Sequence, residues 1–288
     1  MNIAPYSTLP EPYFRGYPDR VVIDNRDLLG LNVGYECCEW RYEAFAAFLF
    51  DWIVEFTSSF SDLRKVNLGN LVRMVSRAAD TVYNTDKYGK RGEFGELMLH
   101  AILREMFNTE PAVSKLYYKS AVNNTVKGFD AVHVRRNSLG DVELWLGEVK
   151  FYQSISDAIT SVTAEISEHL QAKKMREEFM CVGKHVDEEW PYAEQVNKLF
   201  DRNTSLDDVF KVICIPVLLT YESNVIQSAK EVSREFLTAL SDEFIKIHTS
   251  FKSKTPETKV KIQLILLPLE SKKKLIDTLN EKLKGWQR

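Results

Sequence analysis

A turn sequence between two apolar-alternating segments constrains the fold of this chain more than any other feature. Residues 127–136 and 142–152 alternate apolar and polar side chains over much of their length, which is typical of β-strands. The five residues between them are NSLGD, and Asn, Ser, Gly and Asp are the residues that tight turns prefer. The pattern therefore predicts an antiparallel β-hairpin.

The length of this turn also fixes the register of the hairpin. If the five residues form the loop, Arg136 faces Val142, and each step outward along one strand is matched on the other. Asp130 then falls opposite Glu148, and the Cβ atoms of directly facing residues lie about 4.5–5.5 Å apart. Lys150 lies two residues beyond Glu148 and points to the same face. The sequence thus predicts two carboxylates and an ammonium group side by side.

These three side chains suit the hydrolysis of phosphodiesters with a divalent cation. Two carboxylates this close repel each other, which raises one pKa unless a positive charge lies between them. Mg²⁺ satisfies them, because it prefers a few carboxylates with water and phosphate oxygens, and Mn²⁺ accepts similar ligands. Lys150 would orient a water or stabilise the developing charge. The alternative is a simple salt bridge between Lys150 and the acidic pair.

A further acidic residue lies on the helix that is predicted for residues 92–107. The helix opens with Glu93 and Glu96, three residues apart on one face. An acid in the first turn also favours the helix dipole, which is a sufficient explanation for Glu93. Glu96 lies deeper in the helix, and we expect it to reach the metal or its water.

The sequence pattern beyond residue 107 predicts further strands and helices. Ser154 and Asp157 have the spacing of a helix cap. The apolar run 209–221 predicts a buried strand, although Pro216 suggests that it is an edge strand or contains a bulge. The other segments are an extended stretch at 115–122, a helix at 154–179, an irregular region at 183–208, a helix at 225–247, a strand at 259–267 and a helix at 272–284.

The N-terminal third predicts a separate, mostly helical region. Residues 1–35 are rich in Pro, Gly and Tyr and predict irregular structure with a short strand at 20–23. Two helices follow, at 39–56 and 63–83, with apolar residues at helical spacing. We therefore divide the chain into residues 1–85 and 86–288. The inward face expected for the second helix comprises Leu68, Leu71, Val72, Val75 and Ala79.

The charge distribution suggests two clusters that contact DNA. The net charge of −3 opposes a wholly basic nucleic-acid binder. From residue 251 onward, however, ten Lys and Arg stand against four Asp and Glu, a net charge of +6. The candidate contacts with phosphates are Arg135 and Arg136 beside the hairpin loop, and Lys272, Lys273 and Lys274 at the start of the last helix. A solvated surface is an equally good explanation for either cluster.

The composition opposes a zinc site and a membrane location. The four cysteines, Cys37, Cys38, Cys181 and Cys214, lack zinc-binding spacing, and we expect them to be buried free thiols. No apolar run is long enough to cross a bilayer, and the N-terminus has no secretory pattern. The expected location is therefore the cytoplasm, without membrane association.

From residue 92 to 221 the expected element order is αβββαβ, with an acid on the first helix, Asp130 on the second strand and Glu148-Val-Lys150 on the third. This pattern resembles the core of the PD-(D/E)XK, or restriction-endonuclease-like, superfamily of α/β nucleases. The proline of the motif is replaced, since the segment reads KGFD. The resemblance implies that Asp130, Glu148 and Glu96 bind the metal and that Lys150 is the catalytic lysine. The N-terminal helices and a C-terminal α-β-α segment would be additions to this core.

The whole chain is similar, more narrowly, to the HamA family of the Hachiman anti-phage defence system. The segments RGEFGELMLHAIL, KGFDAVHV and ELWLGEVKFYQS carry this resemblance. It implies a helicase partner, HamB, and a Mg²⁺-dependent nuclease that cuts DNA in bacterial immunity. A catalytically silent subunit that binds DNA or the helicase is the alternative, although the complete set of Asp130, Glu148 and Lys150 favours activity.

Overall fold

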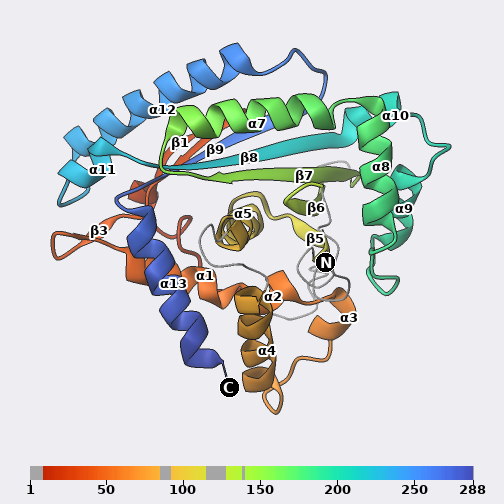
Figure 1. Ribbon diagram of the computed structural model, residues 1–288, viewed down its shortest axis with the longest axis horizontal. Helices are drawn as coiled ribbons and strands as arrows, with labels where there is room; N and C mark the ends of the chain where they lie inside the picture. The colour runs from red at the N-terminus through yellow and green to blue at the C-terminus, as the bar shows by residue number, and fades with distance from the viewer. Residues whose placement is uncertain (1–8, 85–91, 115–127, 138–139, 288) are drawn as a thin grey trace.

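A seven-stranded mixed β-sheet forms the centre of the protein in a computed structural model, which describes residues 9–84, 92–114, 128–137 and 140–287 (Figure 1). Its strands are β1 (Val21–Asp24), β2 (Leu28–Leu31), β5 (Glu110–Val113), β6 (Ala131–Arg136), β7 (Val142–Phe151), β8 (Ile213–Glu222) and β9 (Lys261–Leu269). Their order is β1-β2-β9-β8-β7-β6-β5. The four central strands, β2, β9, β8 and β7, are parallel, and the outer strands pair antiparallel. The expected α/β class is confirmed.

Helices cover both faces of this sheet (Figure 1). One face carries α7 (Ile155–His169) and α12 (Arg234–Lys254), and the opposite face carries α5 (Gly92–Phe107). Outside α5 lie α1 (Tyr42–Asp51) and α13 (Lys272–Trp286), which pack together. The other elements are η1 (Pro18–Arg20), α2 (Ile53–Thr57), α3 (Phe60–Leu63), α4 (Leu71–Asn84), α8 (Ala172–Gly183), α9 (Ala193–Phe200), α10 (Leu206–Val212), α11 (Asn224–Ser228) and the two-stranded β3 (Tyr35–Glu36) and β4 (Glu39–Trp40).

The register predicted for the hairpin is confirmed. Arg136 pairs with Val142, and the antiparallel ladder continues without a shift to Ala131 and Gly147. Directly beyond the ladder, the Asp130 N–H donates to the carbonyl oxygen of Gly147 at 2.8 Å. The turn chemistry and strand alternation were therefore sufficient to place Asp130 beside the end of β7.

The expectation that Pro216 marks an edge strand or a bulge is wrong. Strand β8 lies between β7 and β9, in the middle of the sheet. Proline lacks an N–H, and the pairing of β8 with β7 skips Ile215 and Pro216. The register with β7 is the same on both sides of this gap, and pairing with β9 is continuous through Pro216. The apolar residues of β8 thus favour its burial in the middle of the sheet although Pro216 cannot donate a hydrogen bond.

The expected helix at 63–83 is also wrong in its first part. Leu68 is 95% exposed, and Leu71 and Val72 are exposed as well, whereas Ala79 is fully buried. The reason is a loop in which Asn70 Oδ1 accepts the Asn67 N–H at 2.8 Å and Asn67 Oδ1 accepts the Gly69 N–H at 2.9 Å. Such side-chain bonds to the backbone compete with helix formation, and α4 therefore begins only at Leu71.

Several other expected boundaries are revised. The segment 39–56 contains β4, α1 and the start of α2, and the segment 154–179 divides into α7 and α8 near Leu170. The Ser154 hydroxyl caps α7 as predicted, accepting the Asp157 N–H at 3.3 Å. Residues 183–208, expected to be irregular, contain α9 and the start of α10. The extended stretch at 115–122 lies outside the described residues. Three of the four cysteines, Cys37, Cys38 and Cys181, are exposed, and Cys214 alone is buried.

The N-terminal segment is joined to the rest of the chain through the sheet and through a buried polar network. Strand β2 pairs with β9 in parallel, and β1 extends the sheet from β2. The division of the chain at residue 86 remains a prediction. The network joins α2 to α5: Glu55 Oε2 lies 3.0 Å from Arg104 Nε and 3.1 Å from His100 Nε2. All three side chains are at most 5% exposed.

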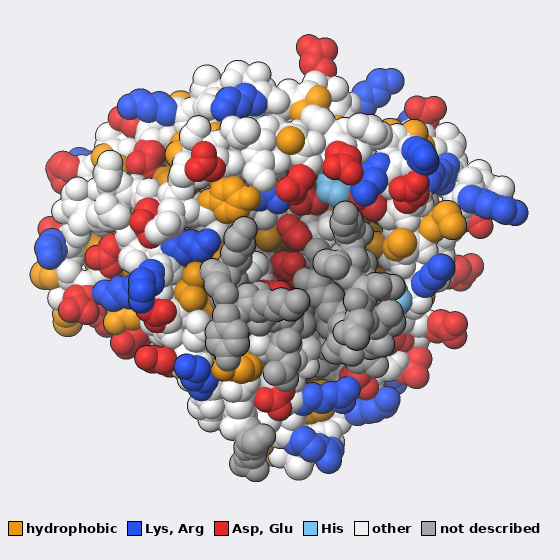
Figure 2. All heavy atoms as spheres, viewed as in Figure 1, with side chains coloured by type: hydrophobic (Ala, Val, Ile, Leu, Met, Phe, Trp, Pro, Cys, Tyr) orange, Lys and Arg blue, Asp and Glu red, His pale blue; other side chains and the backbone are white. Residues whose placement is uncertain are grey.

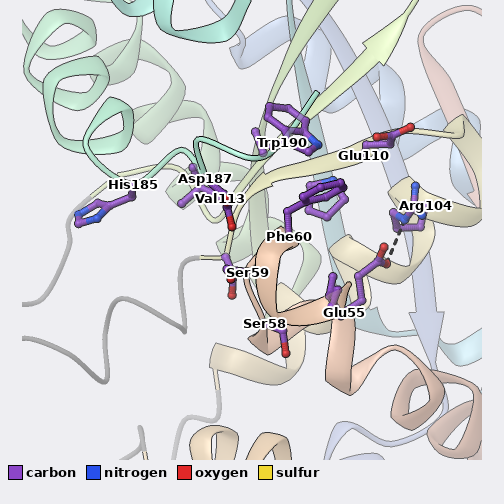
Figure 3. A pocket seen from close by; sticks show the side chains of 14 residues that line it. Glu55, Ser58, Ser59, Phe60, Arg104, Glu110, Val113, His185, Asp187 and Trp190 are labelled. Atoms are coloured by element: carbon purple, nitrogen blue, oxygen red, sulfur yellow. Dashed lines mark hydrogen bonds and ion pairs between the residues drawn. The ribbon is translucent and has the colours of Figure 1, made fainter. Parts of the chain in front are cut away.

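Figure 3 shows a small hollow beside this network, with the Glu55–Arg104 pair at its edge. Its volume of about 30 Å³ is enough for a water molecule but not for a substrate. The network extends inward from His100 to His133, whose ring nitrogens lie 3.2 Å apart. Burial lowers the pKa of His133 well below its usual value. This hollow is therefore part of the structural core and not a candidate for the functional site.

Candidate functional site

A cavity of about 600 Å³ opens where the hairpin meets the first turns of α5, α7 and α13. Figure 2 shows acidic side chains gathered in a hollow near the middle of this face of the molecule. The cavity wall contains three of the four predicted catalytic residues, Glu96, Asp130 and Lys150. Lys272 and Ser154 also line it. The structure thus brings together residues from four separate segments of the chain.

Glu96 reaches this cavity because α5 packs very closely on the sheet. A Cβ on Gly95 would lie 3.1 Å from Val149 Cγ2, and a Cβ on Gly147 would lie 2.8 Å from Leu99 Cδ2. Larger residues at either glycine would push the helix away from β7. The Glu96 side chain is 7% exposed and comes from the face of the sheet opposite α7.

Glu148 lies deep beneath the surface of the protein. It is 2% exposed and is not part of the described cavity wall. Its Oε1 is 2.9 Å from His169 Nε2, and His169 Nδ1 is 2.6 Å from Glu178 Oε1. The ring of Phe129 stacks on His169 with a centroid distance of 4.4 Å. The buried imidazole of His169 therefore joins the carboxylates of Glu148 and Glu178 and holds Glu148 in place.

The charges of Glu148 and His169 affect each other. Burial raises the pKa of Glu148 to about 7, and the nearby Asp130 charge adds to the rise, whereas His169 and Lys150 oppose it. Burial lowers the pKa of His169, but its hydrogen bonds to Glu148 and Glu178 outweigh burial and raise the value to about 10. His169 is therefore protonated at neutral pH, and it provides the positive charge nearest to Glu148.

Lys150 is held by a carboxylate on the neighbouring helix. Its Nζ donates to Glu165 Oε2 on α7, and the Ser161 hydroxyl donates to Glu165 Oε1 at 3.4 Å. Burial lowers the pKa of Lys150, but Glu165, Glu148 and Asp130 outweigh burial and raise it above its usual value. The lysine is therefore a permanent cation beside the acidic pair, which suits stabilisation of negative charge.

Asp130 is fixed at the end of the hairpin. Its Oδ2 accepts the N–H of Val149 at 3.0 Å, so the carboxylate bridges from β6 to the strand that carries Glu148 and Lys150. Within the described ranges, no three His, Cys, Asp or Glu side chains are grouped closely enough to form a metal site as they stand. The chemistry of the donors nevertheless fits a hard cation, because they are all carboxylates. Burial raises the pKa of Glu148, and a bound cation would stabilise the ionised form of this carboxyl group.

The basic clusters expected to contact DNA divide into one residue at the cavity and four outside it. Arg135 and Arg136 lie over the rings of Trp145 and Tyr192, and neither lines the cavity. The structure places Lys272 on the cavity wall, whereas Lys273 and Lys274 form ion pairs with acidic residues elsewhere on and beside α13, namely Asp277 and Glu270.

Sequence reasoning missed His169, Glu178 and Glu165. His169 and Glu165 lie on the helix that follows the hairpin, at four-residue spacing, so they share one helix face. That spacing was a signal for Glu165 and His169, since the face next to the hairpin must carry the groups that neutralise its charges. Glu178 had no such signal, because its approach to His169 depends on the angle between α7 and α8.

The fold and the site define an α/β protein with an acidic cavity and a buried lysine at the end of its central hairpin. The HamA family matches residues 17–283, and the chain belongs to this family. Membership implies a role in the Hachiman defence system against phage. A comparison with curated proteins found no match. Among the described helices, none combines the length and apolar character that a membrane span requires.

The coupled charges predict how stability depends on pH when metal is absent. The folded protein retains protons on Glu148 and His169 that the unfolded chain releases. Stability from neutral Glu148 is lost as pH rises from 4.5 to about 7, and stability from protonated His169 is lost between 6.5 and about 10. We expect urea unfolding in EDTA to show wild type losing about 2 kcal/mol more than Glu148→Gln between about pH 5.5 and about pH 8.5. Equal losses of unfolding free energy in both proteins would show that Glu148 does not retain its proton in the folded state.

Proposed function

We propose that the protein is a metal-dependent DNA endonuclease of the PD-(D/E)XK type that acts in Hachiman defence with the helicase HamB. The observation that supports this most is the cavity wall formed by Glu96, Asp130 and Lys150, with Glu148 buried beside Lys150 on the same strand. A structural salt bridge has no need of two carboxylates from separate segments beside a lysine on the wall of a cavity of this size.

The order of elements supports the same superfamily. From α5 onward the chain forms one helix, the three antiparallel strands β5, β6 and β7, the helix α7 and the parallel strand β8. This order is αβββαβ, with α8, α9 and α10 inserted before β8, although its first strand, β5, lies before the predicted stretch at 115–122. Glu96 lies on α5, Asp130 directly precedes β6, and the ExK segment lies on β7, which supports the proposal.

The residues of the cavity have separate roles in this proposal. Asp130 and Glu148 would hold Mg²⁺ from the hairpin, and Glu96 would hold it, directly or through water, from α5. When bound, the ion would supply positive charge to the scissile phosphate and acidify a water. Lys150 would bind the phosphate oxygen on which negative charge develops, since Glu165 keeps its ammonium group oriented. His169 would hold the Glu148 carboxylate in place.

A specific observation favours the second candidate, a catalytically silent subunit that binds DNA or the helicase. Both residues of the ExK segment have ion-pair partners of their own, since Glu148 contacts His169 and Lys150 contacts Glu165. In a silent subunit these pairs would be permanent. In an active nuclease they would rearrange when metal and DNA enter. A cleavage assay distinguishes the two candidates.

The metal requirement is the first test of the nuclease proposal. With the helicase and ATP present, supercoiled plasmid should be degraded in Mg²⁺ or Mn²⁺ and remain intact in Ca²⁺ or EDTA, because Ca²⁺ binds carboxylates with looser geometry and positions water poorly. The same ions should raise the melting temperature of wild type but not of Glu148→Gln. Intact plasmid in every metal would favour the silent subunit, and undiminished degradation in EDTA would remove the metal from the mechanism.

The partner belongs to the same proposal. A net charge of −3 gives the chain little long-range attraction to DNA, so a helicase would deliver the strand. Omitting the helicase or ATP from the assay should therefore leave most of the plasmid intact. Efficient cleavage by the isolated chain would refute this dependence while leaving the nuclease proposal standing.

A further inference from the structure

One lysine on the cavity wall comes from a part of the chain that takes no part in the predicted motif. Lys272 is the first residue of α13, which packs against α1 and α4. Its side chain nevertheless lines the cavity together with Asp130 and Lys150. The end of β8 holds it there, because Glu222 Oε1 accepts the backbone N–H of Lys272 at 2.9 Å.

The ammonium group of Lys272 forms no ion pair within the described part of the chain. Its Nζ donates to the carbonyl oxygen of Phe151 and lies 4.4 Å from the centre of the Phe151 ring. No carboxylate among the described residues lies within ion-pair distance of it, whereas the next two lysines pair with Asp277 and Glu270. Lys150, on the same wall, also has its own carboxylate. Lys272 therefore differs from these lysines in having an ammonium group that lines the cavity and forms no ion pair.

Such an arrangement is unfavourable for the empty protein. A half-buried ammonium group without an ion pair loses hydration that a backbone carbonyl and a ring replace only in part. Burial lowers the pKa of Lys272 and outweighs the opposing effect of the nearby Glu222 charge. A side chain kept in this state at the wall of a polar cavity is typical of a group whose counter-charge arrives with a ligand. The ligand group that Lys272 would bind is anionic, because Lys272 is a cation without an ion pair.

We propose that Lys272 binds a phosphate oxygen of the nucleic-acid strand that enters the cavity, at a phosphate other than the one that is cut. This rests on the proposed nuclease function, in which Lys150 and the three carboxylates serve the scissile phosphate. Lys272 is thus a substrate-positioning residue, and Lys273 and Lys274 are not part of the contact.

The test compares charge removal at two ends of the same helix. Binding of a fluorescein-labelled DNA of about 20 nucleotides, single-stranded or duplex, is measured by anisotropy in EDTA at several salt concentrations, so that no cleavage occurs. Lys272→Met should weaken binding about tenfold and reduce the salt slope by about one. Lys284→Met, which removes the same charge from the exposed end of α13, is the control and should change neither quantity. Lys272→Arg should restore most of the affinity.

A second measurement separates this role from a structural one. If Lys272 only anchors the end of β7 through the Phe151 carbonyl, Lys272→Met should lower the urea midpoint of unfolding. Under the proposal, Lys272→Met should have a midpoint at or above that of wild type, because the substitution removes a half-buried charge that forms no ion pair.

The outcomes are distinguishable. Wild-type affinity in Lys272→Met, or equal losses in Lys272→Met and Lys273→Met, would overturn the assignment of Lys272 alone. Weakened binding by Lys272→Met in a protein that never cuts DNA would reject the nuclease and retain the phosphate contact. Wild type that binds neither DNA would overturn the phosphate contact, whereas the nuclease proposal would stand or fall on plasmid cleavage with the helicase and ATP.

Discussion

Plasmid cleavage should fall about 100- to 1000-fold when Lys150 is replaced by methionine, because the substitution removes a fixed cation from the place where negative charge develops. The methionine keeps most of the apolar stem that is buried in the cavity wall. Glu165, the partner left behind, has a side chain that is 40% exposed, so water can solvate it and the fold should persist.

The matched control for this substitution is Lys261→Met on β9. Lys261 is exposed and pairs with Cys214, near the start of β8, whereas Lys150 pairs with Leu219 further along the same strand. The control removes the same charge from the same sheet, away from the cavity, and should retain wild-type cleavage. Circular dichroism and melting temperature verify that both variants fold. Cleavage at the wild-type rate by a folded Lys150→Met protein would show that the site assignment is wrong.

Removing the buried carboxylate of Glu55 should cost about 3–5 kcal/mol of unfolding free energy. In Glu55→Ala, the buried Arg104 would lose the carboxylate that lies 3.0 Å from its Nε, while its hydrogen bond to the Thr109 carbonyl would remain. His100 loses the same carboxylate. Urea unfolding followed by circular dichroism measures the loss.

An exposed ion pair provides the comparison for the Glu55 variant. Glu189 lies 3.3 Å from Arg64, and both side chains are more than half exposed, at 60% and 57%. Glu189→Ala should therefore change the unfolding free energy by no more than about 0.5 kcal/mol. A loss for Glu55→Ala as small as that of the control would show that the buried network does not hold α2 to α5.

The parts of the fold that could be predicted are those specified by neighbouring residues. The hairpin register followed from the turn residues and the strand alternation, and it placed Asp130 beside the strand of Glu148 and Lys150 without any tertiary information. The interior of α5 and the Ser154 cap are equally local. Local patterns failed where a competing interaction decided the outcome, as in the asparagine loop before α4 and at Pro216 in the middle of the sheet.

The site was predictable only as far as the hairpin extends. The support of Glu148 by His169 depends on how α7 crosses the sheet, and the role of Glu178 depends on the turn between α7 and α8. Lys272 could be suspected as one of several lysines, but its separation from Lys273 and Lys274 required the packing of α13. Alternation gives the side of a strand on which a residue lies, and it gives no information on which distant segment covers that side.

The pairing of β2 with β9 determines when this protein can finish folding during its synthesis. Leu28 pairs with Leu264, so an N-terminal strand must wait for the ribosome to add more than two hundred residues. At about 5–20 residues per second, this delay is roughly 10–50 s. Until then the side of β2 that pairs with β9 is open, and such an edge invites pairing with other nascent chains. Lys272 emerges later still, so the cavity is completed only after β9 has joined the sheet. A growing chain would therefore lack the proposed phosphate contact of Lys272.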